Sequence, residues 1–149
     1  KTLKIRRVFE EGPVALVRSM MQGVVQRGTA KGLASYGIQE GVAGKTGTTS
    51  NYKDAWFVGF TSDLLGLVWI GFDDNKALQM SGSRAALPIW GTLMKEVGPH
   101  PQPFSLPSEI IQVEIDRKSG KLASRECPQT TKELFIDGTE PTEKCTSED

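Results

Sequence analysis

Histidine is almost absent from the sequence, and neither positive nor negative charge is in excess. The only histidine among 149 residues, His100, lies between two prolines, so a Ser-His-Asp triad or a histidine metal cluster has nothing to build on. Eighteen basic residues balance eighteen acidic ones, which leaves no positive field to attract nucleic acid. We therefore expect no metal, no cofactor and no nucleic-acid partner.

Long apolar runs are missing as well. The longest, Leu64–Phe72, has about half of the ~20 apolar residues that a helix needs to cross a bilayer. The chain starts at Lys1 without a methionine or a signal peptide and soon enters an amphipathic pattern, so we interpret it as the middle of a longer polypeptide. Any membrane anchor is then expected only in the preceding, N-terminal part of that polypeptide.

Cysteine is scarce, and both cysteines, Cys127 and Cys145, lie near the C-terminus. Their spacing does not fit a Cys-x-x-Cys redox motif, and no histidine lies nearby to complete a zinc site. A disulfide and two free thiols both remain open, and a disulfide would suit an oxidising compartment.

Two amphipathic helices are predicted from the spacing of apolar residues. From Pro13 to Gln26 these residues recur at steps of three and four, and Gly28 is expected to close the helix in the left-handed conformation. A second apolar stripe predicts another helix, which begins near Pro88 and stops at Gly98.

The stretch between the two helices predicts three strands. A glycine-rich segment leads into a short strand over Val42–Thr48, and the aromatic and β-branched runs Asp54–Phe60 and Leu64–Phe72 predict a hairpin. The second run is apolar at nearly every position, which predicts that both of its faces are covered. Together the elements predict an α/β fold of the α+β type, in which an antiparallel sheet packs between helices.

Composition divides the chain into three parts. Residues 1–98 hold the predicted helices and sheet, and residues 99–107 contain four prolines, which predicts an extended linker. Residues 108–149 have alternating apolar residues from Ile111 to Ile115 and a short apolar run at Leu134–Ile136. This last part is predicted to be a small β-rich C-terminal extension.

The most informative stretch is Gly44–Thr49, which reads Gly-Lys-Thr-Gly-Thr-Thr on a predicted strand. A lysine ammonium, threonine hydroxyls and a glycine without a side chain are suited to bind a carboxylate against the backbone. The N–H groups of a strand edge also pair with an extended peptide or hold an oxyanion. The alternative is a solvated turn, since so short a string is common by chance.

A phosphate-binding loop is a further alternative, because Gly41–Thr46 approaches the pattern Gly-x-x-x-x-Gly-Lys-Ser/Thr. That pattern requires a glycine where this chain has Gln39. It also requires a helix directly after the lysine and threonine, where this chain has a glycine and a strand. We therefore reject a phosphate loop.

Three blocks of sequence, in order, resemble the transpeptidase domain of class A penicillin-binding proteins, whose family carries a Lys-Thr-Gly motif. The blocks are Val42–Thr49, Asp54–Phe60 and Val68–Asp74. The resemblance covers Val14–Val97 and, more loosely, the extension around Gly138–Thr142. It implies a domain of the serine β-lactamase and transpeptidase type that cross-links peptidoglycan at the periplasmic, extracytoplasmic face of the bacterial membrane.

The resemblance also implies roles for the motif residues. Lys45 would supply positive charge near the nucleophile and the substrate carboxylate, and the backbone N–H of Thr48 would form half of an oxyanion hole. Gly47 would keep the strand open, while the hydroxyls of Thr46 and Thr48 would bind the carboxylate. Thr49 completes the predicted substrate-binding stretch. The implied ligands are a D-Ala-D-Ala stem peptide of peptidoglycan and the β-lactams that imitate it.

The family also needs a nucleophilic Ser-x-x-Lys and a Ser-x-Asn loop upstream of Lys-Thr-Gly, and neither pattern occurs before Lys45. The literal Ser-x-x-Lys at Ser50–Lys53 follows the motif and is interpreted as a polar loop. We therefore expect the remainder of a penicillin-binding protein to supply the serine, and this chain alone to be inactive. Two alternatives stay open, a D,D-carboxypeptidase or β-lactamase of the same superfamily and a non-catalytic cell-wall interaction module.

A part of a larger sheet should leave apolar surface where its neighbours would pack. We expect such a surface on the sheet or on the first helix. Trp56, Trp69 and Trp90 lie in core-like patterns, so packing is favoured for them over a carbohydrate platform. Trp56 is the first exception to consider, because it follows the motif so closely.

Overall fold

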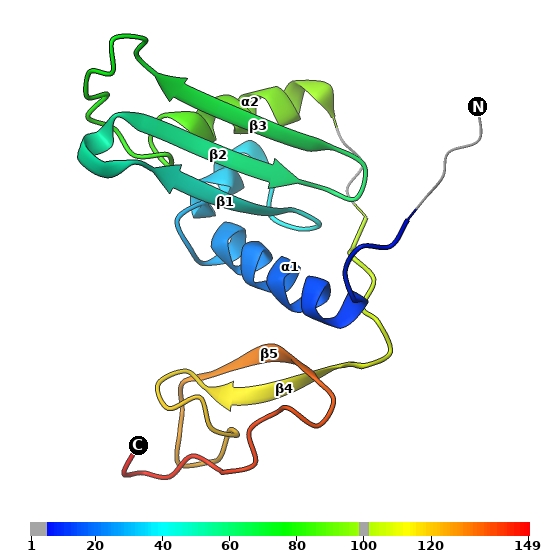
Figure 1. Ribbon diagram of the computed structural model, residues 1–149. Helices are drawn as coiled ribbons and strands as arrows, with labels where there is room; N and C mark the ends of the chain where they lie inside the picture. The colour runs from blue at the N-terminus through cyan, green and yellow to red at the C-terminus, as the bar shows by residue number, and fades with distance from the viewer. Residues whose placement is uncertain (1–5, 99–101) are drawn as a thin grey trace. The chain divides into compact units, whose positions relative to one another are not determined.

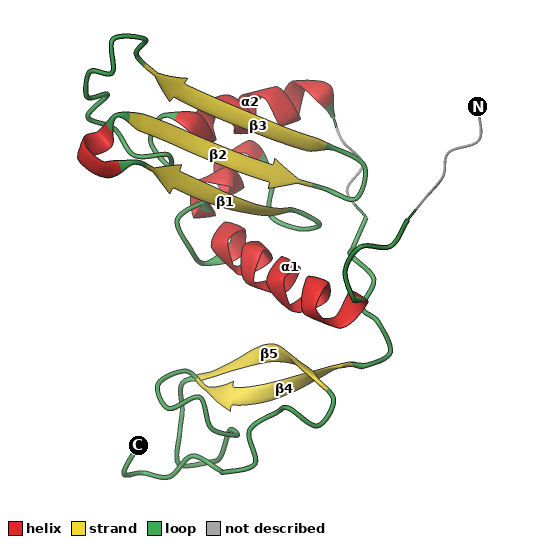
Figure 2. Ribbon diagram, viewed as in Figure 1, coloured by secondary structure: helices red, strands yellow, loops and turns green. Residues whose placement is uncertain are grey.

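The computed structural model describes residues 6–98 and 102–149, so His100 lies outside the described residues. The chain divides into two compact units, one spanning Arg18–Ser105 and the other combining Leu106–Asp149 with the N-terminal stretch up to Val17. Each unit has its own sheet, as Figures 1 and 2 show. No helix within the described part of the chain is long and apolar enough to span a bilayer.

The larger unit contains a three-stranded antiparallel sheet in the order β1-β2-β3 (Figure 2). Its strands are β1 (Ala43–Thr48), β2 (Asp54–Phe60) and β3 (Leu65–Gly71). The helices of the chain are α1 (Glu11–Gln26) and α2 (Ala86–Val97), with the short 3-10 helices η1 (Lys31–Tyr36) and η2 (Ser50–Tyr52). The predicted α+β class with an antiparallel sheet is confirmed, and the bounds predicted for the two α-helices and for these three strands lie within about two residues of the observed ones.

Helical segments cover one face of this sheet, and the core lies between them and the strands. Trp90 of α2 is fully buried, its ring meets Phe57 of β2 edge-on at 5.1 Å, and its indole N–H donates to the Gly66 carbonyl at 3.0 Å. The other buried core residues are Val25, Ala30, Leu33, Val42, Ala86, Leu87 and Met94. Gly59 gives the tryptophan room, since a Cβ there would lie 2.6 Å from Trp90 Cζ2.

The two glycines that were expected to end helices behave differently. Gly98 follows α2 with a φ of 65°, and its N–H donates to the Met94 carbonyl at 3.0 Å, as predicted. Gly28 does not have a positive φ, so the left-handed closure predicted for it is wrong. The chain instead passes so close to α1 that a Cβ on Gly28 would lie 2.8 Å from Val24 Cα. A close approach therefore explains the glycine at this position.

The other face of the sheet is apolar and exposed. On β3, Leu65, Leu67 and Trp69 are 69%, 55% and 45% exposed. The prediction that both faces of this strand are covered is therefore wrong, because in the described chain helices pack against one face only. The exposed apolar surface expected for part of a larger sheet is present here, and α1 adds a second one at Val14, Val17 and Met20.

The stretch predicted to be a proline-rich linker is described from residue 102 onward, and residues 102–107 form neither helix nor strand. Phe104 nevertheless packs edge-on against Phe60 at a ring distance of 5.8 Å. The guanidinium of Arg18 lies over the Phe104 ring, 4.8 Å from its centre, and donates to the Ser105 carbonyl at 2.5 Å. Within the larger unit, Phe104 and Ser105 are thus held by contacts with Phe60 and Arg18.

The smaller unit contains a two-stranded antiparallel sheet made of β4 (Ile110–Asp116) and β5 (Thr130–Ile136). A disulfide joins Cys127 to Cys145, which are 18 residues apart in the sequence. Between Leu106 and Asp149, Ile110 is the only buried apolar residue besides these two cysteines. Since the core of this unit is so small, we expect the cross-link to supply much of its stability.

Gly59→Ala should destabilise the larger unit by about 1 to 3 kcal/mol, because the added methyl group would overlap the buried ring of Trp90. Thermal unfolding monitored by near-UV circular dichroism measures the change. Gly32→Ala is the matched control, since its Cβ would lie 3.6 Å from Leu87 Cδ2, an ordinary contact. Equal melting temperatures for the two variants would contradict this account of the packing.

Replacing Cys127 and Cys145 by serine should destabilise the smaller unit by roughly 3 kcal/mol, because the loop that the disulfide closes gains conformational entropy in the unfolded state. Hydrogen exchange of the amides in β4 and β5 should become faster. The amides of β1 to β3 belong to the other unit and serve as an internal control. Unchanged exchange in β4 and β5 would show that the hairpin is stable without the cross-link.

Candidate active site

The strand that carries the Lys-Thr-Gly-Thr sequence, β1, lies at the edge of its sheet and, among the described residues, pairs only with β2 (Figure 1). The Thr49 N–H donates to the Asp54 carbonyl at 3.1 Å, just beyond the end of the ladder. Because successive residues of an antiparallel strand face the partner and the open side in turn, the N–H of Thr48 points to the open edge. The edge therefore presents a backbone donor next to the predicted substrate-binding residues.

The predicted site residues lie on both sides of this edge. Side chains alternate between the two faces of a strand, and Gly47 pairs with Trp56 on the exposed face of the sheet. Lys45 shares that face with Gly47, whereas Thr46 and Thr48 point to the face that the helices cover. The structure thus brings the motif residues to one edge but does not gather their side chains into one cluster.

Lys45 is exposed, and its ammonium donates to the backbone carbonyl of Thr46 at 2.6 Å. An ammonium has three N–H donors, so this contact leaves two for a ligand. The carbonyl of Thr46 faces the open edge by the same alternation that directs the Thr48 N–H outward. Positive charge and hydrogen-bond donors therefore occur together at the unpaired side of β1.

Two contacts hold the threonines from the helix side. The hydroxyls of Thr46 and Thr29 are 2.8 Å apart, and the hydroxyl oxygen of Thr48 accepts from the Gly82 N–H at 3.0 Å. Gly82 lies directly against the sheet, since a Cβ there would be 2.4 Å from the carbonyl oxygens of Gly47 and Trp56. Only glycine fits this position without displacing backbone. Thr29 and Gly82 were not predicted as site residues. Thr29 follows a helix and Gly82 lies between two serines, and neither local sequence indicates a contact with β1.

The link after β1 is compact. The predicted substrate residue Thr49 donates its hydroxyl proton to the carboxylate of Asp54, and Ser50–Tyr52 forms η2 between β1 and β2. Asn51 and Tyr52 have φ values of 59° and 53°. The literal Ser-x-x-Lys therefore lies in a tight turn between two strands, as the interpretation of this segment as a polar loop implies.

Two of the three tryptophans lie on the exposed face beside the motif. Trp56 and Trp69 are 37% and 45% exposed, and their rings are 6.0 Å apart with an angle of 45° between their planes. Packing in the core, favoured for all three, is observed for Trp90 only. The exposed pair places aromatic surface next to Gly47, which is paired with Trp56.

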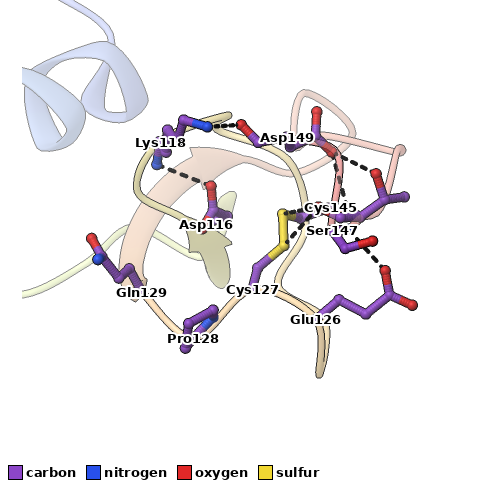
Figure 3. Close-up of a pocket in the computed structure, with 10 residues that line it drawn as sticks. Asp116, Lys118, Glu126, Cys127, Pro128, Gln129, Cys145, Ser147 and Asp149 are labelled. Carbon is purple, nitrogen blue, oxygen red and sulfur yellow. Dashed lines mark hydrogen bonds between the residues drawn. A yellow bond between two sulfur atoms is a disulfide. The ribbon is translucent and has the colours of Figure 1, made fainter.

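A second candidate site lies in the smaller unit, where a pocket of about 190 Å³ lies beside the disulfide. Figure 3 shows the residues that line it. The buried carboxylate of Asp116 accepts from the N–H groups of Lys118 and Ser119 and from the Ser119 hydroxyl. The hydrogen bond from the Ser119 N–H is the main reason why the pKa of Asp116 lies below its ordinary value.

Asp116 also lies near both sulfurs, and with Cys127 and Cys145 it forms the one group within the described residues that has the spacing of metal ligands. The sulfurs are bonded to each other, however, and a disulfide offers no thiolate to a metal. We therefore interpret the pocket as a structural feature of the turns that the disulfide joins, and not as a metal site.

Comparison with known proteins identifies both parts of the chain. Residues 2–95 match the penicillin binding protein transpeptidase domain, and residues 106–149 match the C-terminal domain of penicillin-binding protein 1A. The chain is 44% identical over 131 residues to penicillin-binding protein 1A of Aquifex aeolicus, which covers 85% of this chain and 18% of that protein. It is 38% identical over 125 residues to penicillin-binding protein 1A of Escherichia coli, covering 72% and 14%. The chain thus spans less than a fifth of the length of these two relatives.

A solved structure shows the same fold. The chain matches the crystal structure of penicillin-binding protein 1A from Haemophilus influenzae with a TM-score of 0.80 and 34% sequence identity, over 93% of this chain and 22% of that one. The resemblance predicted from the three sequence blocks is therefore confirmed, and the chain belongs to the penicillin-binding protein transpeptidase family.

Proposed function

We propose that this chain forms one wall of the active site of a D,D-transpeptidase that cross-links peptidoglycan. The observation that carries the proposal is the open edge of β1, where the Thr48 N–H points away from the sheet within a Lys-Thr-Gly-Thr sequence. Family membership and the names of the relatives support the same activity. The chain would act at the extracytoplasmic face of the membrane as the C-terminal part of a longer class A penicillin-binding protein.

The edge of β1 suits the end of a peptide. The stem peptide of peptidoglycan ends in D-Ala-D-Ala, so an extended backbone that terminates in a carboxylate would pair with the open edge like an added strand. The Lys45 ammonium would attract the carboxylate with its remaining donors. The hydroxyls of Thr46 and Thr48 would add hydrogen bonds from the face that the helices cover, and Thr49 would end the binding stretch.

The reaction begins when a serine hydroxyl attacks the carbonyl carbon of the penultimate D-Ala and its proton passes to a base. The carbonyl oxygen becomes an oxyanion, which the Thr48 N–H would stabilise. The C–N bond to the last D-Ala then breaks, the departing amine takes up a proton, and an acyl-enzyme remains. An amine of a neighbouring peptidoglycan strand attacks this ester and loses a proton, and the serine regains its own.

The serine and its base would come from the preceding part of the longer polypeptide, since neither a Ser-x-x-Lys nor a Ser-x-Asn pattern occurs before Lys45. β-Lactams imitate D-Ala-D-Ala and would leave the serine acylated. Neither step requires a metal or a cofactor.

Two other functions use the same residues or the same chain. A D,D-carboxypeptidase or a β-lactamase would form the same acyl-enzyme and pass the acyl group to water, but the match of residues 106–149 favours a protein of the 1A type. The extension also has its own sheet and disulfide, which supports a second role as a module that binds a cell-wall partner. Capture of such a partner by residues 108–149 alone would support that role.

The purified chain should not be labelled covalently by a fluorescent penicillin, whereas the longer polypeptide that contains it should be. The reason is that the ester forms on a serine outside these 149 residues. Denaturing gel electrophoresis with in-gel fluorescence measures the label, and an excess of unlabelled penicillin provides the control. Stable labelling of the short chain would contradict the proposed division of the active site.

Thr48→Pro in the longer polypeptide should lower the rate of acylation about 10²- to 10³-fold relative to Thr48→Ala, because only the proline variant lacks the backbone N–H. An edge strand tolerates proline where the N–H faces away from the partner strand. Both variants lose the hydroxyl that accepts from Gly82, so their comparison isolates the N–H. Equal acylation rates in rapid-quench experiments would exclude this N–H from the oxyanion hole.

A further inference from the structure

Asp54, the first residue of β2, connects the ends of all three strands of the larger sheet. Its carboxylate accepts from the Thr49 hydroxyl at 3.0 Å through Oδ2 and from the Trp69 indole N–H at 3.0 Å through Oδ1. Its backbone N–H donates to the Thr49 hydroxyl oxygen at 2.8 Å, and its carbonyl accepts from the Thr49 N–H at 3.1 Å. Thr49 is therefore bound to Asp54 by both its backbone and its side chain.

Apart from Asp54, the restraints at this end of β1 are the hydrogen bond from the Tyr52 N–H to the Thr49 carbonyl at 3.1 Å and the packing of Gly82 against Gly47. Neither contact holds the Thr49 N–H or its hydroxyl. Gly47 precedes Thr48 and has the least conformational preference of any residue, and the turn after Thr49 contains Asn51 and Tyr52 with positive φ. The hydrogen bond between Gly82 and Thr48 holds a side chain, not the peptide group that carries the Thr48 N–H. The direction of that N–H depends on Thr49 facing β2, since neighbouring residues of the strand point to opposite edges.

The contact from β3 fixes the orientation of the carboxylate. The indole of Trp69 lies over Gly71, where a Cβ would be 2.7 Å from Trp69 Cζ2 and 2.9 Å from Asp54 Oδ1. With Oδ1 held by the indole N–H, Oδ2 is directed to the Thr49 hydroxyl. A hydrogen bond to a charged acceptor is stronger than one between neutral groups, so a carboxylate is well suited to this place.

We propose that Asp54 is a positioning residue for the oxyanion-binding edge of β1. It holds Thr49 against β2 so that the neighbouring Thr48 N–H points at the reacting carbonyl oxygen. The proposal rests on the proposed transpeptidase function, and Asp54 acts through Thr49 without touching the substrate. Its removal should therefore slow the acylation step more than it weakens the binding of the β-lactam that precedes acylation.

The experiment compares variants of the longer polypeptide in rapid-quench acylation by a fluorescent penicillin, with initial binding and the acylation rate constant determined separately. Asp54→Ala should lower the acylation rate constant at least about tenfold, because a small misplacement of a catalytic group is costly. Asp54→Asn should restore most of the rate, since its amide oxygen still accepts from Trp69 and its N–H₂ donates to the Thr49 hydroxyl oxygen. Val68→Ala is the control for general loss of stability, because Val68 packs against the core in the same sheet and does not contact Asp54.

The outcomes separate this proposal from the function on which it rests. If the unaltered polypeptide is acylated and Asp54→Ala reacts at the same rate, the positioning role is wrong while the transpeptidase proposal stands. The positioning role would also be wrong if Val68→Ala and Asp54→Ala have the same melting temperature and slow acylation equally. Loss of stability alone would then explain the slower reaction. Failure of the unaltered polypeptide to react with penicillin would overturn both proposals.

Discussion

The proposed site depends on β1 being paired along one edge only. A backbone N–H in an edge strand donates either to the neighbouring strand or to a group beyond the edge of the sheet. In an antiparallel pair these two directions alternate along the strand. Here the Thr49 N–H serves the sheet, so the Thr48 N–H is left for a ligand. A further strand beside β1 would take up that donor and leave no open edge for an extended peptide.

An open edge binds well only if the strand behind it is rigid, and close packing provides that rigidity. Gly82 lies against the carbonyl oxygens of Gly47 and Trp56, and Trp90 fills the space left by Gly59 on the next strand. At these positions the absence of a side chain lets backbone or an aromatic ring approach within van der Waals distance. The glycines of this region thus support the site from the side opposite to the exposed tryptophan pair.

Much of the fold could be predicted from local patterns, because strand runs, helix periodicity and a helix-ending Gly98 are encoded within a few residues. The motif strand and its following hairpin were found in this way. Contacts between distant segments, such as those of Thr48 with Gly82 and of Asp54 with Trp69, have no periodic signal and were missed. Gly28 was misjudged because a glycine can serve a close approach as well as a turn. The burial of β3 and of Trp56 and Trp69 was misjudged because an apolar run does not reveal which neighbours belong to the same chain.

Lys45 also opposes unwanted pairing of the exposed edge of β1 with other strands. Unpaired N–H and C=O groups on an edge strand also invite pairing with other copies of the chain, and natural sheets often oppose this with a lysine. The Lys45 ammonium donates to the Thr46 carbonyl, an acceptor on the open side, so it occupies an acceptor that another strand would need. A substrate carboxylate is a stronger partner for an ammonium than a neutral carbonyl is, and it would draw the lysine away and free that acceptor for the peptide. The charge that is proposed to attract the substrate would then also keep the edge from pairing with an unrelated strand.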